Sequence, residues 1–276
     1  MLQTFPIPRR GRSVMVVGFC LTLLSCQTTP ITQRSQLILI DEPQEVALGI
    51  KAYQSALSKA KLSTDVEKTA MIQRVGKRIA AVADRPDYRW EFTLIQDDKM
   101  VNAFALPGGK VAVYTGILPV AESEAGLAAV MSHEVAHAIA RHGGERMTTG
   151  LLAQMGMTAL NVGLAVKGED PETIRAFNTA YGLGAQFGVL LPFSRNQESE
   201  ADHIGIILMA RAGYDPKEAL GFWQRMAATK KAAAPEWLTT HPGDATRIRQ
   251  LRALLPEAEK EYHAPGRPVI PTSSQP

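Results

Sequence analysis

The chain has 276 residues, of which 45% are hydrophobic and 21% are charged, and its formal net charge is +3. This composition excludes disorder over most of the length and suffices for one large core or two small ones. Arg9, Arg10 and Arg12 account for the whole positive excess, so the rest of the chain is neutral and no nucleic-acid partner is expected.

Residues 1–26 have the pattern of an export signal. The three arginines precede a short apolar run over 14–24, which is typical of a secretory signal rather than a membrane span. The residues before Cys26 resemble the lipobox of bacterial lipoproteins, and Gln27 follows where such proteins are sorted to the outer membrane. We therefore expect a periplasmic lipoprotein, lipidated at Cys26 and anchored in the inner leaflet of the outer membrane. An uncleaved signal anchor is the main alternative, and a twin-arginine signal is a weaker one.

Both cysteines of the chain, Cys20 and Cys26, lie inside this signal segment. The domain that follows has no thiol pair for a disulfide, and any metal site in it must use histidines and carboxylates.

The pattern of apolar residues predicts an α+β fold that is mainly helical, with one small β-sheet. Residues 27–42 are rich in Thr, Gln and Ser and are interpreted as a tether, and residues 256–276 as a flexible tail. The domain between them, 43–255, begins with helices over 43–61 and 66–82. Three strands follow, over 90–95, 101–106 and 110–114, the last two joined by the turn Pro107-Gly108-Gly109. Six helices complete it, over 122–142, 146–167, 172–190, 196–212, 216–230 and 244–254.

The segment 147–166 is apolar enough to resemble a membrane helix. It also contains Gln154, Asn161, several threonines and several glycines, so a buried or substrate-facing helix is the favoured interpretation.

Residues 133–137 form the pattern H-E-x-x-H in a helical run. A spacing of four places His133 and His137 on one helix face, where both imidazoles can bind a single Zn²⁺. Glu134 lies beside them and can take a proton from a water that the metal acidifies. The flanking residues are apolar nearly all round, which predicts a buried helix, and buried polar groups need a partner such as a metal. Two solvated histidines on a surface helix are the alternative.

A third metal ligand is expected in the acidic run that begins at residue 198. Glu198 and Asp202 share a helix face, so one can bind the metal while the other accepts the free N–H of a ligand histidine. Glu200 points well away from that face. His142, at the end of the H-E-x-x-H helix, is interpreted as structural because a histidine there suits the helix dipole.

H-E-x-x-H followed by E-x-E-A-D resembles the gluzincin zinc metallopeptidases of family M48, which include the HtpX, Oma and CAAX prenyl protease groups. The resemblance extends to N-A-F-A-L-P-G-G at 102–109 and to T-H-P at 240–242. It implies a zincin-type fold with the small sheet beside the active-site helix, and one Zn²⁺ per chain. It further implies that Glu198 is the third ligand and that Asp202 supports a ligand histidine.

The same resemblance places His241 and Arg247 at the active site. His241 is expected either to contact the substrate oxyanion or to cap the zinc, and Arg247 to support the site through Asp202. An extended substrate is expected to add to a sheet edge at Val111 and Val113, with Asn102 binding its backbone. A hairpin that merely covers the core is the alternative.

These residues predict a zinc endopeptidase that cleaves misfolded or mis-assembled cell-envelope proteins. The first alternative is a latent enzyme or a non-cleaving periplasmic chaperone for outer-membrane proteins, although a pure binder has no need of Glu134. The second is a structural lipoprotein whose zinc only braces the fold.

Overall fold

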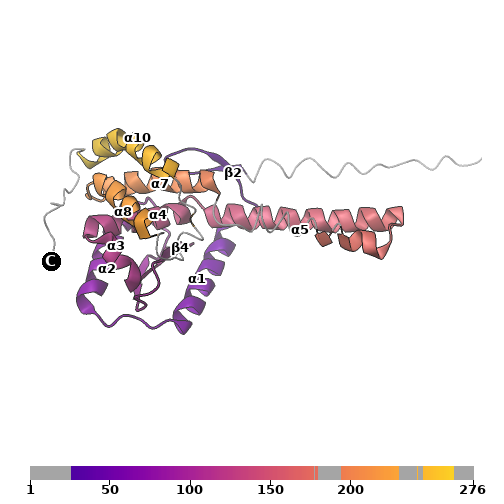
Figure 1. The fold of residues 1–276 in the computed structure, drawn as a ribbon, viewed down its shortest axis with the longest axis horizontal. Coiled ribbons are helices and arrows are strands. Elements are labelled where there is room, and N and C mark those ends of the chain that lie inside the picture. Colours follow the sequence, from indigo (N-terminus) through magenta and orange to yellow (C-terminus); the bar gives the residue numbers. More distant parts are fainter. Residues whose placement is uncertain (1–25, 177, 180–193, 230–240, 242–244, 264–276) are drawn as a thin grey trace, which may run out of the picture.

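Helix α4 (Glu124–Ile139) lies at the centre of a mainly helical fold in the computed structural model, which describes residues 26–176, 178–179, 194–229, 241 and 245–263 (Figure 1). The other helices that surround or extend this core are α1 (Glu42–Lys59), α2 (Val66–Ala80), the short α3 (Leu118–Ala121), α5 (His142–Lys167), α7 (Arg195–Arg211), α8 (Lys217–Thr229), α10 (Ala245–Tyr262) and a 3₁₀ turn at Thr115–Ile117. The predicted α+β, mainly helical class is confirmed.

Two small sheets accompany these helices. Strands β1 (Cys26–Thr28) and β2 (Ser35–Leu37) pair antiparallel near the N-terminus. Strands β3 (Glu91–Ile95), β4 (Ala103–Leu106) and β5 (Lys110–Tyr114) form the second sheet in the order β3-β5-β4. β3 runs parallel to β5, whereas β4 is antiparallel to it. The turn from β4 to β5 needs Gly108 and Gly109, because both have positive φ angles of 86° and 82°.

The contact between α4 and α7 positions the predicted metal residues. Every residue of α4 except Glu124 is buried, and most of α7 is buried as well. Gly205 of α7 lies directly against the backbone of His133, where a Cβ atom would come within 3.1 Å of the His133 Cα. This close approach brings the acidic side chains of α7 next to the histidines of α4.

Residues 27–42 do not form the expected tether. They fold onto the domain: Thr29 and Ile38 are buried, and the Gln36 amide donates a hydrogen bond to the backbone oxygen of Ala140. Short polar side chains in this stretch suggested a linker, but they satisfy polar groups of the domain instead.

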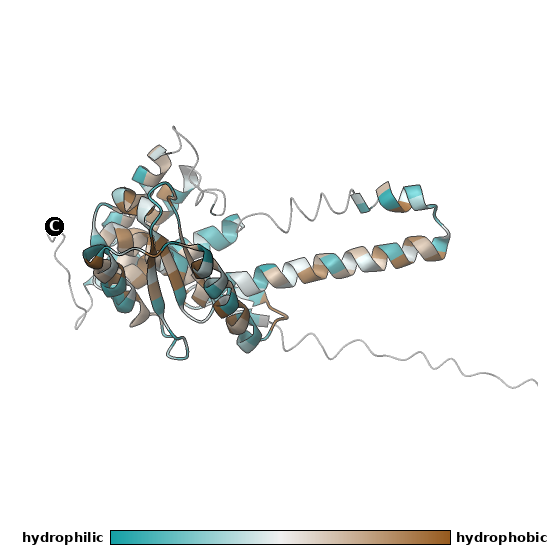
Figure 2. Ribbon diagram, turned by 90° about the horizontal axis from the view of Figure 1, so that it is seen from below, coloured by the Kyte–Doolittle hydropathy of each residue, from teal (hydrophilic) through white to brown (hydrophobic). Residues whose placement is uncertain are grey.

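The expectation that residues 147–166 are buried is wrong for most of α5, and the alternative that they face a substrate stays a prediction. This helix projects away from the body of the molecule (Figures 1 and 2), and exposed apolar side chains run along it, namely Leu151, Leu152, Met155, Val162 and Val166. Within the part of the chain that the structure describes, α5 is the one helix long and apolar enough to cross a membrane, by length and composition.

Two other predicted boundaries also differ from the structure. Helix α10 continues through Pro256 to Tyr262 and buries Ala258, so the flexible tail does not begin at residue 256. Residues 171–176 and 178–179 are helical, and the rest of the helix expected over 172–190 lies outside the described residues.

The closeness of α4 and α7 gives a prediction about Gly205. Replacing Gly205 by Val forces two buried backbones apart, and we expect it to lower the free energy of unfolding by about 1–3 kcal/mol. The control is Gly150→Val on α5, where nothing lies within 4 Å of an added Cβ and no loss is expected. Urea unfolding of both variants measures the difference, and equal stabilities would show that this approach is not tight.

Candidate metal centre

Four buried side chains from three parts of the chain converge at the C-terminal half of α4. His133 and His137 come from α4, Glu198 from the first turns of α7, and His241 from the segment before α10. One ligand atom from each lies within 4.8 Å of the others. The capping box at the start of α7, in which Ser194 and Gln197 bond each other's backbone N–H, fixes the turn that presents Glu198.

The distances within this cluster fit a tetrahedral zinc site. His133 Nε2 lies 3.1 Å from His137 Nε2 and 3.4 Å from His241 Nδ1. Glu198 Oε1 lies 3.4 Å from His137 Nε2 and 2.9 Å from His241 Nδ1. Ligands that surround one Zn²⁺ at about 2.0–2.1 Å are about 3.3 Å apart. The second carboxylate oxygen of Glu198, Oε2, lies 3.6 Å from His133 Nε2 and 3.4 Å from Nη1 of Arg247. These residues fit zinc.

The electrostatics of the cluster keep Glu198 ionised. Burial alone would raise its pKa, but hydrogen bonds from His133, His137 and His241 hold the pKa well below its usual range. Burial lowers the pKa of His137 well below its ordinary value. Burial and the nearby Arg247 also act to lower the pKa of His133, yet its contacts with Asp202 and Glu198 outweigh them and raise it to about 9.

Asp202 and Arg247 form the layer behind His133. Asp202 Oδ1 lies 3.0 Å from His133 Nδ1, on the side of the ring opposite the cluster, and 2.5 Å from Nη2 of Arg247. The guanidinium of Arg247 also lies 3.8 Å above the ring of Trp223. The carboxylate can therefore accept the free N–H of His133 while Arg247 balances its charge.

Glu134 lies beside the cluster, next to His241. Its side chain is buried, and its Oε1 is 3.6 Å from Nε2 of His241. The carboxylate thus faces the same space as the ligand atoms, on the side where His241 enters.

One residue beside the cluster, His142, was expected to be only structural. His142 is fully buried, its Nδ1 lies 2.8 Å from Nδ1 of His137, and its Nε2 lies 3.0 Å from Oε2 of Glu200. It begins α5 rather than ending α4, because Arg141 adopts a left-handed φ of 57° and reverses the chain. His142 lies five residues after His137 and beyond the end of α4, so it lacks the helical spacing of three or four residues that would have placed it on the face of His137.

The strand predicted to bind substrate at its edge is the central strand of the sheet. Val111 and Val113 lie on β5, which pairs with β3 on one side and β4 on the other, and both side chains are fully buried. Among the described residues the strand with a free edge facing α4 is β4, and Asn102 directly precedes it. The turn at 107–109 and the alternation of apolar residues predicted the hairpin of β4 and β5. They could not show that β3 pairs with the other side of β5.

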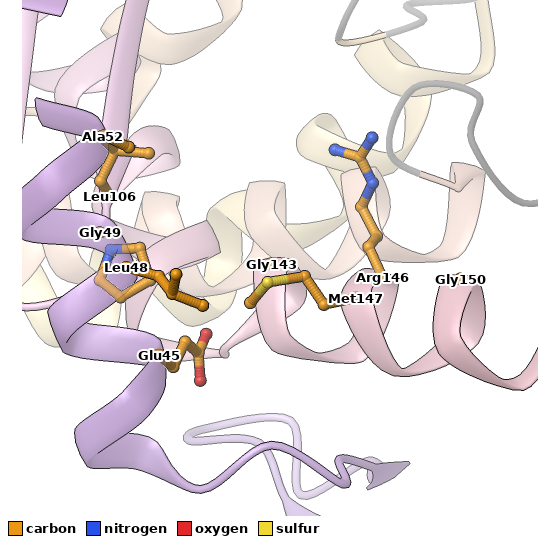
Figure 3. A pocket seen from close by; sticks show the side chains of 10 residues that line it. Glu45, Leu48, Gly49, Ala52, Leu106, Gly143, Arg146, Met147 and Gly150 are labelled. Atoms are coloured by element: carbon orange, nitrogen blue, oxygen red, sulfur yellow. The ribbon is translucent and has the colours of Figure 1, made fainter. Parts of the chain in front are cut away.

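A cleft of about 380 Å³ opens between α1, the end of β4 and the base of α5. Leu48 and Met147 point toward one another across it, and the lining is mainly apolar (Figure 3). Arg146, which also lines the cleft, interacts electrostatically with Glu198 of the metal cluster.

Comparison with known proteins agrees with this geometry. The sequence profile of peptidase family M48 matches residues 67–255, which include both metal-binding helices. The chain belongs to peptidase family M48. Peptidases of this family use zinc, and the His133, His137, Glu198 and His241 site supplies the donors for it.

Named members of family M48 are similar to most of this chain. Mitochondrial metalloendopeptidase OMA1 of Schizosaccharomyces pombe is 37% identical over 83% of this chain and 66% of its own length. Human metalloendopeptidase OMA1 is 30% identical over 85% of this chain and 47% of its own. The β-barrel assembly-enhancing protease of Escherichia coli K12 is 28% identical over 87% of this chain and 51% of its own. The chain thus spans about half to two thirds of these relatives.

The raised pKa of His133 predicts that this M48 peptidase releases a proton when it takes up zinc. Metal ligands bind in their deprotonated form, and His133 holds its proton up to a pKa of about 9 in the metal-free site. We expect about one proton per zinc near pH 7.5, and an apparent affinity that rises about tenfold per pH unit between pH 7 and 9. Calorimetry in buffers of different ionisation enthalpy measures the release. An affinity that does not change over this interval would contradict it.

Proposed function

We propose that this chain is a zinc-dependent endopeptidase in which His133, His137 and Glu198 hold the metal and Glu134 is the general base. The observation that carries the proposal is the placement of the Glu134 carboxylate beside a buried cluster with zinc-like spacing. Its relatives named metalloendopeptidase support the same reaction.

The chain's own residues divide the work of peptide hydrolysis. Zinc, when bound, supplies a Lewis acid that polarises the peptide carbonyl and acidifies water. Glu134 takes the proton of the attacking water and then delivers it to the leaving amine. Asp202 and Arg247 keep His133 in the tautomer whose Nε2 faces the metal.

An extended substrate fits the free edge of β4 better than the predicted edge at Val111 and Val113. The Tyr114 N–H donates to the backbone oxygen of Asn102, so alternate residues of β4 turn their backbone groups toward β5. The backbone groups of Ala105 then point to the free edge, where a peptide can add as a further strand, whereas the Ala103 N–H already donates to Asn102 Oδ1 at 2.9 Å. The apolar cleft beyond Leu106 is suited to one aliphatic side chain of that peptide.

His241 supports a second candidate state, in which the enzyme is latent. Its Nδ1 lies among the ligand atoms, so a zinc held there would have four protein ligands and no open position. A catalytic zinc keeps one position open for water. We therefore propose that His241 caps the metal and must leave before Glu134 can act, rather than contacting the oxyanion in this conformation.

The physiological substrates we propose are misfolded or mis-assembled cell-envelope proteins. Support comes from the lipoprotein-like signal at residues 1–26, which would place the chain in the periplasm on a lipid anchor at Cys26, and from relatives named β-barrel assembly-enhancing protease. Other relatives are named mitochondrial metalloendopeptidase OMA1, and that name points to a different compartment. A chaperone that only holds outer-membrane proteins would use the β4 edge without needing Glu134.

Glu134→Gln tests the peptidase directly. Glutamine keeps the size of the side chain but cannot accept the proton, so casein cleavage is expected to fall by at least about 100-fold with zinc content unchanged. Glu124→Gln, at the half-buried first residue of the same helix and outside the metal cluster, is the control and is expected to cleave normally. Zinc without cleavage in both the parent chain and the control would leave the latent enzyme and the chaperone, which His241→Ala then separates.

His241→Ala separates the two roles of that histidine. If His241 caps the metal, the variant keeps zinc through three ligands and cleaves casein several-fold faster than the parent chain. The measurement is the initial rate per bound zinc. A slower rate at full zinc content would assign His241 to the oxyanion instead.

A further inference from the structure

We propose that His142 is a positioning residue that fixes the orientation and tautomer of His137, with Glu200 and residues 29–34 holding His142 in place. The inference rests on the zinc site of the proposed function and adds a support that passes from the metal ligand to the N-terminal segment.

The hydrogen bonds between the two histidines allow one consistent arrangement. His137 turns its Nε2 toward the cluster, 3.1 Å from His133 Nε2, so that nitrogen must be free of a proton to bind a metal. The proton of neutral His137 is then on Nδ1, which donates to the unprotonated Nδ1 of His142 at 2.8 Å. The remaining N–H of His142, on Nε2, donates to Glu200 Oε2 at 3.0 Å.

A second imidazole stands here where a carboxylate or carbonyl usually supports a ligand histidine. The geometry of α7 explains the need for it. Glu198 and Asp202 face the cluster, whereas Glu200 lies on another side of the helix and bonds to His142 rather than to His137. The ring of His142 bridges that gap because the left-handed turn at Arg141 folds the start of α5 back toward α4.

The N-terminal segment fixes Glu200 from the far side. Thr29 Oγ1 donates to Oε1 of Glu200 at 2.7 Å, Thr32 donates to the same oxygen, and Arg34 Nε donates to Oε2 at 2.7 Å. Both carboxylate oxygens therefore have defined partners, and the carboxylate cannot rotate away from His142. Residues just after Cys26 thus support a metal ligand although none of them approaches the metal.

The bend that carries His142 is itself clamped. The Arg141 guanidinium donates to Glu45 Oε2 at 2.7 Å and also contacts Gln27, and Gly144 N–H donates to Glu45 Oε1 at 3.1 Å. If His142 only fills space at this bend, any side chain of similar volume can replace it. If His142 positions His137, its replacement must also present a hydrogen-bond acceptor to His137. That difference separates the two roles experimentally.

The test measures the zinc dissociation constant of the full chain, purified in detergent, by competition with a chromophoric chelator. His142→Phe keeps a ring but loses the acceptor, and we expect zinc binding to weaken by about 10–100-fold. His142→Asn restores an oxygen that can accept, and is expected to recover part of the affinity. The control is His203→Phe, because His203 lies on the outer side of α7 and bonds Glu257.

Cobalt substitution gives a second readout that packing alone would not change. The visible spectrum of Co²⁺ bound to His142→Phe is expected to differ from that of the parent chain, while His203→Phe matches it. If His142→Phe does not fold, Glu200→Gln keeps the side-chain size and is expected to weaken zinc binding in the same direction, with Glu257→Gln as its control.

The outcomes distinguish this inference from the function it rests on. A parent chain that binds no zinc would overturn both. A parent chain that binds zinc, with unchanged affinity and cobalt spectrum in His142→Phe and Glu200→Gln, would overturn the positioning role alone.

Discussion

The structure depends on neutralising a cluster of buried charged and polar groups between two apolar helices. Three histidines, Glu198 and Asp202 are buried where α4, α7 and the segment before α10 meet. Burying such groups without partners costs several kcal/mol each, so the fold is consistent only if a cation and a network of hydrogen bonds satisfy them. Zinc would bind the imidazole nitrogens that face the cluster. Asp202, Arg247 and His142 contact the nitrogens on the opposite sides of the rings.

This requirement explains why distant segments of the chain meet at one place. His133 is supported from α7 and α10, and His137 from the start of α5 and, through Glu200, from residues 29–34. An arginine pairs with the carboxylate that supports each of the two α4 histidines: Arg247 pairs with Asp202 behind His133, and Arg34 pairs with Glu200 behind His142 and His137. The site is therefore a property of the whole domain, including the N-terminal stretch.

Much of the fold and of the metal site could be predicted from sequence because their signals are local. H-E-x-x-H fixes a helix face, and the spacing of Glu198 and Asp202 fixes a second one. The features that escaped prediction depend on contacts across the fold: the polar residues 27–42 gain partners only after folding, β5 becomes central only when β3 pairs with it, and His142 is redirected by one left-handed residue. Residues 147–166 resemble a core helix in composition, yet α5 leaves the core.

X-ray absorption at the zinc edge of the purified, zinc-loaded chain identifies the ligands of the metal. We expect four nitrogen or oxygen ligands at about 2.0 Å, with the multiple-scattering pattern of three imidazoles, from His133, His137 and His241. Two imidazoles would remove His241 from the metal and leave the rest of the site intact. A spectrum with one imidazole or none, or with six oxygen ligands, would contradict the assignment of the cluster as a zinc site.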